Sequence, residues 1–281
     1  MILIADCGGS KSDWVAARED CEAVGRFAGR GYNPRWMGQE ELENLLAVVC
    51  GALNVATDNV RRVHFYGAGC GSAEAAAKVA ATLQGVFNVA SCEVAGDLLG
   101  ACRAVWGANA GLTGILGTGS NFCHYDGSAI DCQTLSTGWI LGDEGSGSHI
   151  GRKLIKAFAE GRMPETLRSG FASLYGRTAE QWIAEVYASP TPNRTLASVV
   201  PFAAENIEHP YVKGLVDSCF NEYFETHKAV AGRYGCAVGF VGGVAAAFAA
   251  SLRSAALRHG LTVADVLSKP IDRLVRFHAK N

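Results

Sequence analysis

Two short stretches of glycine and hydroxyl residues could bind an anion through their backbone. Residues 117–120 read Gly-Thr-Gly-Ser between an apolar run at 112–116 and a second strand-like run at 121–125. Residues 8–12 read Gly-Gly-Ser-Lys-Ser, again between strand-like runs. Small residues at the tip of a hairpin let neighbouring backbone N–H groups point outward together, which suits phosphate. Each stretch alone also fits a plain turn, because glycine and serine are ordinary turn residues.

Two aspartates at the ends of expected strands are candidates for acid–base or metal chemistry. Asp6 follows an apolar strand at 2–5, and Asp97 stands between a short strand at 91–95 and a helix at 98–106. Open α/β sheets bind ligands at the carboxyl ends of their strands, and a helix N-terminus favours the ionised form of an acid. Aspartate is also a common helix N-cap, so Asp97 can serve structure and chemistry together.

A third glycine-rich loop, at 142–148, carries two adjacent acids. Asp143 and Glu144 lie in this loop, ahead of a helix expected at 149–158. They could cap that helix, or they could bind hydroxyl groups or a metal ion. We favour a binding role, because two other loops in the chain have the same glycine-rich character.

The remaining glycine turns do not match the common nucleotide-binding signatures. Residues 8–12 are not a Walker loop, because Ser10 stands where a glycine should precede Lys-Ser. The run at 67–72 follows a strand and precedes a helix, but its glycines do not form the G-x-G-x-x-G pattern of dinucleotide-binding proteins. Gly242 and Gly243 follow another strand and either let the backbone pass close to a ligand or only open the next helix.

The strand pattern at the start of the chain is repeated near its middle. Strands expected at 2–5, 14–17 and 24–28 are joined by short connections and predict an antiparallel meander. From residue 112 the same order of three strands returns, with a glycine turn after the first. This repetition indicates an internal duplication of architecture, although the residues themselves do not repeat.

Helical periodicity accounts for most of the other segments. Helices are expected at 40–53, 73–86, 98–106, 149–158, 196–208, 211–234 and 244–259, with one or two more within 163–188 and a break at 190–192. The tail at 261–280 carries spaced apolar residues and is expected to pack on the body of the protein.

Length and composition indicate a soluble protein of two domains. The chain has 281 residues, and we place the domains at 1–107 and 108–281, with the last ~20 residues packing back on the first. A net charge of −2 without a basic run argues against a nucleic-acid partner, and no apolar run is long enough for a membrane span.

The cysteines and the start of the chain favour a cytoplasmic location. Met1 opens directly on a strand, without a signal-peptide pattern, and the ten cysteines include no Cys-x-x-Cys pair. We therefore expect reduced and mostly buried cysteines. Cys7 and Cys70 lie beside candidate loops, where inert packing is the expected role rather than reactivity.

Taken together, these stretches resemble the sugar kinase, Hsp70 and actin superfamily, and within it the BadF/BadG/BcrA/BcrD-type ATPase family that includes N-acetylglucosamine kinase. The resemblance runs the length of the chain. The matching segments are 6–12 (first phosphate loop), 117–121 (second phosphate loop), 138–139 with 142–146 (sugar-side loop), 242–245 (adenosine loop) and the C-terminal residues 270–278.

The resemblance implies an α/β fold of two ribonuclease-H-like (actin-like ATPase) domains with a nucleotide cleft between them, and ATP and Mg²⁺ as cofactors. It implies a kinase that phosphorylates the 6-hydroxyl of N-acetylglucosamine or a close relative. Asp97 matches the family's catalytic aspartate, which takes the proton from that hydroxyl, and Asp6 would hold Mg²⁺ through water. The other implied contacts are to ATP (Gly8, Gly9, Ser10, Lys11, Ser12, Gly117, Thr118, Gly119, Ser120, Gly242 and Gly243) and to the amino sugar (Asn33, Asn121, Asp143 and Gly145).

Other functions within the same fold group stay open from the sequence. Redox activator ATPases couple ATP hydrolysis to electron transfer through an iron–sulfur cluster that bridges two subunits, but they carry a cysteine just before the second phosphate loop, where this chain has Ile115 and Leu116. A glucosamine or N-acetylmuramic acid kinase would show the same motifs. A non-catalytic nucleotide-dependent regulator is disfavoured by the intact Asp6 and Asp97, and no DNA-binding helix pair precedes Met1. The oligomeric state is open, with a homodimer as one form.

Overall fold

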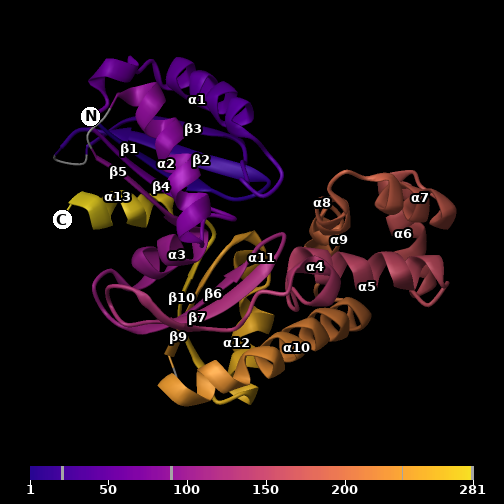
Figure 1. Cartoon of the computed structure of the whole chain (residues 1–281). Helices are drawn as coiled ribbons and strands as arrows, with labels where there is room; N and C mark the ends of the chain where they lie inside the picture. Colours follow the sequence, from indigo (N-terminus) through magenta and orange to yellow (C-terminus); the bar gives the residue numbers. More distant parts are fainter. Residues whose placement is uncertain (20–21, 89–90, 236, 280–281) are drawn as a thin grey trace. The chain divides into compact units, whose positions relative to one another are not determined.

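Two five-stranded sheets organise the chain, each in its own compact unit (Figure 1). The computed structural model describes residues 1–19, 22–88, 91–235 and 237–279. The first unit comprises residues 1–111 and 125–131 with the segment from residue 269, and the second comprises 112–124 and 132–268.

The first sheet combines a meander with two parallel crossovers. β1 (Ile2–Cys7), β2 (Lys11–Ala17) and β3 (Ala23–Arg30) pair antiparallel, as the sequence predicted. β4 (Arg62–Gly67) and β5 (Ser91–Gly96) continue the sheet parallel to β1, in the order β3-β2-β1-β4-β5. The helices of this unit are α1 (Gln39–Leu53), a short 3₁₀ helix (Thr57–Asn59), α2 (Ala73–Phe87), α3 (Asp97–Trp106) and α13 (Ile271–Ala279).

Helices cover both faces of the first sheet (Figure 1). α1 and α2 lie on one face, where the buried side chains of α1 at 42, 45, 46, 49 and 53 follow the helical period and meet apolar residues of β1 and β4. α3 and α13 pack against each other on the opposite face. α2 begins at Ser72, whose hydroxyl accepts the N–H of Ala75 at 3.3 Å.

The second sheet repeats the strand order of the first. β6 (Gly111–Leu116), β7 (Ser120–Tyr125) and β8 (Ile130–Gln133) are neighbours, and β9 (Ala237–Val241) and β10 (Thr262–Leu267) add to β6 in parallel, in the order β10-β9-β6-β7-β8. The duplication of architecture that the sequence indicated is therefore complete, with five strands in each half.

Nine helices are described in the second unit. They are α4 (Gly138–Leu141), α5 (Gly147–Ala159), α6 (Glu165–Tyr175), α7 (Ala179–Ala188), α8 (Pro192–Ala197), α9 (Val200–Glu205), α10 (Pro210–Tyr234), α11 (Gly243–Ala247) and α12 (Ala249–Arg258). Aromatic side chains of the long α10 fill the core against the sheet, with Phe224 edge-on to Phe240 of β9. Among the described residues, no helix is long and apolar enough to cross a membrane.

Three expected elements differ in the structure. The helix expected at 196–208 is divided into α8 and α9, because Pro201 has no N–H to donate to the preceding turn and instead takes a position in the first turn of a new helix. The helix expected at 244–259 is interrupted at Phe248, between α11 and α12. The tail contains an unexpected strand, β10, whose alternation is broken by a register shift between Val263 and Asp265.

Candidate active site

In the first unit, two candidate carboxylates lie on one edge of the sheet. Cys7 of β1 pairs in register with Gly67 of β4, and Gly67 pairs with Gly96 of β5. The carboxyl ends of these three parallel strands therefore coincide, with Asp6 at the end of one and Asp97 directly after another.

The pKa of Asp6 is raised to about 7. Burial is the largest cause, and the negative charges of Asp97 and Asp13 raise it further. Lys269 opposes this shift, and its Nζ lies 2.6 Å from Oδ1 of Asp13. The sequence did not point to Lys269 as a site residue. Its one distinguishing feature there is its position just ahead of the C-terminal segment that resembles the family.

Asp97 begins α3 and has its own set of electrostatic contacts. Burial raises the pKa of this carboxyl, whereas backbone N–H groups and the charge of Arg35 favour its ionised form. Oδ1 accepts the N–H of Leu98 at 2.9 Å. Arg35 is a second residue that sequence reasoning missed. Asp97 as a whole residue is half-buried.

The first glycine loop is held by the end of β3. The N–H of Gly31 donates to the carbonyl of Ser10 at 3.1 Å, and a Cβ added to Gly31 would lie 1.9 Å from the carbonyl oxygen of Gly8. Ser12 is buried, donates its hydroxyl to the Arg30 carbonyl at 2.7 Å and accepts Nε1–H of Trp14 at 3.0 Å. The Ser12 hydroxyl therefore fixes the loop within the sheet, while Lys11 is exposed.

Asn33 lies between the first loop and the turn after β4. Its Oδ1 accepts the N–H of Arg35 at 3.0 Å, and a Cβ added to Gly69 would lie 2.3 Å from the same Oδ1. Gly69 has φ +83°, so the absence of a side chain there serves both the turn and the close approach of Asn33. Nδ2 of Asn33 would lie 3.9 Å from a Cβ added to Gly9, so the structure brings Asn33 next to the first glycine loop.

Burial keeps two nearby thiols protonated. The pKa of Cys7 and that of Cys70 are each raised to about 12, chiefly by burial. Both side chains belong to the interior of the first unit, as expected for inert packing.

In the second unit, the second glycine loop is a tight turn fixed by the start of α5. Gly117 donates its N–H to the carbonyl of Gly119 at 3.0 Å. The carbonyls of Gly117 and Thr118 accept the N–H groups of Gly147 and Ser148 at 2.8 and 3.1 Å. These contacts engage the loop's carbonyls and fix the turn against the start of α5.

Asp143 lies directly against this loop. A Cβ added to Gly119 would be 2.8 Å from Oδ2 of Asp143, and the backbone N–H of Ser120 bonds the carboxylate. Burial is the main cause that raises the pKa of Asp143, and the charge of Glu144 adds to it. Asp143 itself has φ +56°, an uncommon backbone conformation for a residue with a side chain.

Asn121 and Gly145 are positioned by residues that sequence reasoning did not single out. The hydroxyl of Tyr223, on α10, donates to the carbonyl of Asn121 at 2.9 Å. The N–H of Gly145 donates to Nδ1 of the buried His149 at 3.0 Å, and Nε2 of that ring lies 3.3 Å from Glu222. Because Nδ1 accepts a hydrogen bond, the ring proton belongs on Nε2, which faces the Glu222 carboxylate.

Gly242 and Gly243 follow β9, next to the end of β6. Ile115 pairs with Val241 in register, so Gly242 comes beside Leu116 and the start of the second loop. The N–H of Gly242 donates to the carbonyl of Leu267 on β10 at 2.8 Å. Gly243 begins α11, and nothing would contact a Cβ at that position.

The repeated strand order, with a glycine hairpin after the first strand of each sheet, is that of the sugar kinase and actin-like ATPase fold, whose members have two domains around a nucleotide cleft. No protein-family model and no curated protein matches the chain.

Solved structures match along its whole length. A protein from Porphyromonas gingivalis assigned as an N-acetylglucosamine kinase is 38% identical, with 100% of this chain and 99% of that chain covered and a TM-score of 0.94. A protein from Chromobacterium violaceum with the same assignment is 16% identical, with 99% and 98% covered and a TM-score of 0.75. A ROK family glucokinase from Streptomyces griseus, in complex with glucose and AMPPNP, is 13% identical, with 99% and 97% covered and a TM-score of 0.62.

The chain belongs to the N-acetylglucosamine kinase-like family within the sugar kinase and actin-like ATPase superfamily, as its resemblance to that family indicated.

Proposed function

We propose that this protein is an ATP-dependent amino-sugar kinase that phosphorylates the 6-hydroxyl of N-acetylglucosamine or a close relative. The observation that carries the proposal is the common sheet edge of Asp6 and Asp97, in a chain 38% identical to a protein assigned as an N-acetylglucosamine kinase. Phosphoryl transfer depends mainly on positioning and charge neutralisation, and a carboxylate that accepts the hydroxyl proton completes the requirements.

In this proposal Asp97 is the general base. Burial raises the pKa of Asp97, which strengthens it as a proton acceptor, while the Leu98 N–H and the charge of Arg35 favour its ionised form. The proton moves from the sugar 6-hydroxyl to the carboxylate as the oxygen attacks the phosphorus. The carboxylate stands in the first turn of α3, where its Oδ1 accepts the Leu98 N–H at 2.9 Å.

Asp6 is the residue we propose for Mg²⁺, held through water. The fit is electrostatic: its pKa is raised by burial and by two neighbouring acids, and a divalent cation would lower it again. Mg²⁺ prefers carboxylate and water oxygens, and when bound it neutralises charge on the transferred phosphate. The neighbouring Lys269 holds Asp13, which limits the negative charge at the site.

We assign ATP to the glycine turns of both units. Gly8 to Lys11 offer exposed or partly buried backbone, and Gly117 to Ser120 form a hydrogen-bonded turn whose carbonyls are occupied by α5. Gly242 and Gly243 are assigned to adenosine. We assign the amino sugar to Asn33, Asn121, Asp143 and Gly145, whose polar groups are held in place by the hydrogen bonds described above.

The redox-activator alternative lacks its cluster ligand in this chain. Leu116 fills the position just before the second glycine loop, and its side chain is fully buried in the core of the second unit. A glucosamine or N-acetylmuramic acid kinase would use the same carboxylates, so these two substrates are separated by experiment.

A panel of amino sugars with Mg-ATP tests the proposal. N-acetylglucosamine, glucosamine, N-acetylmannosamine and N-acetylmuramic acid would each be assayed for ADP release, with phosphorus NMR to locate the new phosphate. We expect turnover with N-acetylglucosamine or a close relative and a phosphate on the 6-oxygen. Slow ATP hydrolysis that no hexosamine accelerates would overturn the kinase assignment.

We further propose that the protein acts in the cytoplasm. We also propose that its partner is a small molecule rather than a nucleic acid, and its net charge of −2 supports this second point. A homodimer is the assembly that light scattering would test first.

A further inference from the structure

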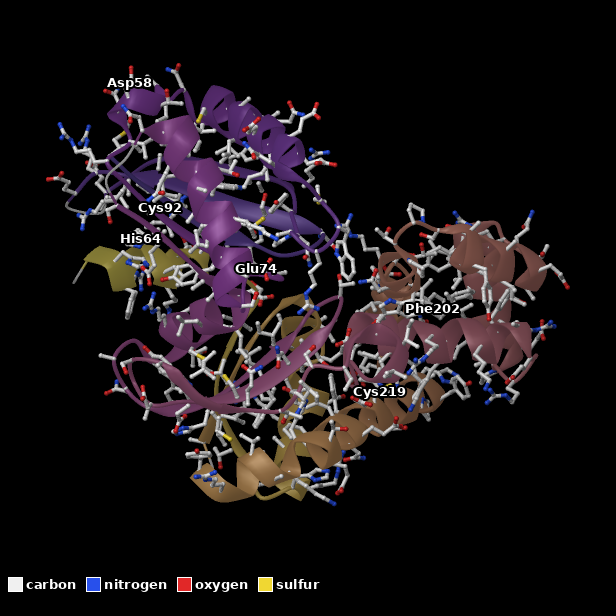
Figure 2. The ribbon with its side chains drawn as sticks, viewed as in Figure 1. Asp58, His64, Glu74, Cys92, Phe202 and Cys219 are labelled. Carbon is white, nitrogen blue, oxygen red and sulfur yellow. The ribbon has the colours of Figure 1, made fainter. Side chains whose placement is uncertain are left out.

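One face of β4 is polar although helices cover it. Side chains alternate along a strand, so Arg62, His64 and Tyr66 share one face, while Val63 and Phe65 belong to the apolar core under α1 and α2. Parallel strands covered on both faces usually carry apolar residues on both. Figure 2 shows His64 beside α13, the yellow helix. The kinase proposal makes no use of this face.

A hydrogen-bonded network occupies that face. Arg103 of α3 donates to both the Tyr66 oxygen and Glu93 of β5, and Tyr66 lies 2.8 Å from Nε2 of His278 on α13. Nδ1 of His64 lies 2.9 Å from Glu93, and the rings of His64 and His278 stack with centroids 3.6 Å apart. The Tyr66 hydroxyl oxygen accepts a hydrogen bond from Arg103, so its proton is donated to Nε2 of His278. The charge of Glu93 is balanced by Arg103 within the network.

A pocket of about 400 Å³ opens on this network. Its walls include Arg62, Arg103, His64, His278 and Phe277, together with the turn at 127–128. The lining residues include two arginines, Arg62 and Arg103, against one acid, Glu93. The Arg103 Nε is buried and makes no hydrogen bond to any residue that the structure describes.

The lining charges favour an anion over a cation. Burial is the largest cause that lowers the pKa of His278; the charge of Glu93 opposes this shift, and the charges of Arg103 and Arg62 add to it. Arg62 forms no ion pair within the described part of the chain, so its charge is available to the pocket. The nearby Asp126 is exposed and accepts the N–H groups of Ser128 and Ala129 within its own turn.

We propose that this pocket binds a small phosphate monoester, with the phosphate held by Arg62 next to the charge of Arg103 and the carbon portion against Phe277. Arginine presents paired donors that match phosphate oxygens, and pockets of this volume take small metabolites. A divalent metal is the competing occupant, because ligand atoms of His64, Glu93 and His278 lie within 4.8 Å of one another. The positive charges of Arg62 and Arg103 beside that cluster would repel a metal cation.

Isothermal titration with the intact protein tests the site. The nucleotide site would first be saturated with Mg-AMPPNP, and inorganic phosphate or ribose 5-phosphate would then be titrated into wild type, Arg62→Gln and the control Arg61→Gln, whose side chain is exposed and does not line the pocket. We expect Arg62→Gln to weaken binding by about 10-fold or more, and Arg61→Gln to bind as wild type does. Circular dichroism would confirm that both variants fold.

Two outcomes would overturn the proposal. One is that inorganic phosphate and ribose 5-phosphate each bind Arg62→Gln with the same affinity as wild type. The other is a metal site, seen as Co²⁺ absorption bands that disappear in Glu93→Gln while neither phosphate binds. Phosphate-dependent shifts of the His64 and His278 imidazole resonances, absent in Arg62→Gln, would support it. Because the titration measures no phosphoryl transfer, failure of the kinase proposal would leave this result unaffected.

Discussion

A Cβ added to Gly242 would lie 2.2 Å from the carbonyl oxygen of Leu116. Gly242 also has φ +128°, a conformation that side chains rarely adopt. The end of β6 and the turn after β9 therefore meet backbone to backbone, at the start of the second glycine loop. The adjacent Gly243 has open space at its Cβ, so the pair provides a matched comparison.

We predict that Gly242→Ala lowers the melting temperature and weakens ATP binding by about 10-fold or more, because the backbone must move by an ångström or so to admit the methyl group. Gly243→Ala should behave nearly as wild type in both assays. Thermal unfolding and nucleotide titration measure the two effects. Equal behaviour of the two variants would contradict the proposed close packing of this turn.

Asp97→Asn should retain Mg-ATP binding and lose turnover by ~10²–10⁴-fold, the usual contribution of a general base. The amide keeps the shape and can still accept the Leu98 N–H, so α3 should begin unchanged. Steady-state kinetics and nucleotide titration separate the two effects. A kcat close to that of wild type would remove Asp97 from the proposed mechanism.

Asp6→Asn should stabilise the metal-free protein while abolishing Mg²⁺-dependent activity. The folded-state pKa of Asp6 is about 7, above its ordinary value of 3.8, so ionisation costs folding free energy as pH rises between these values. We expect a rise in melting temperature of about 2 °C or more at pH 8, fading to none near pH 4. The control is Asp58→Asn at an exposed site (Figure 2), which should change neither quantity.

The apparent affinity for Mg²⁺ should fall as pH drops below 7. The protonated Asp6 carboxyl cannot hold the hydrated cation, so affinity should decrease by about 10-fold for each pH unit well below the pKa. Mg²⁺ would be titrated at a fixed concentration of nucleotide analogue between about pH 5.5 and about pH 8, which spans about one pH unit or more on each side of the Asp6 pKa. The change of affinity with pH gives this slope. An affinity constant across that range would show that Asp6 does not titrate with the metal.

Much of the fold could be predicted because the strands and helices carry regular patterns. The meander at β1 to β3 and the amphipathic α1 followed directly from alternation and helical period. The strand β10 did not, since the register shift at Val263 breaks the period of two on which strand prediction relies. Pro201, in turn, divides a segment whose apolar spacing alone suggested one continuous helix.

The candidate site, like the fold, could be predicted only in part from the sequence. Glycine turns and strand-end acids are local signals, and they marked Asp6, Asp97 and both glycine loops. Lys269, Arg35, His149 and Tyr223 have no local signal, because each acts on a group that is distant in sequence or that lies around a turn. Their contribution depends on distances that only the packed chain defines.

The sequence by itself determined the α/β class, the duplicated order of strands and the residue types available for phosphoryl transfer, because these follow from short-range periodicity and from side-chain chemistry. The tertiary structure alone decided that β1, β4 and β5 end at one edge, which brings Asp6 and Asp97 together and raises the pKa of Asp6. It also placed His278 of the C-terminal helix against His64 of β4. The first relationship arises from long-range strand pairing and the second from packing of α13 on the sheet, and no local pattern encodes either.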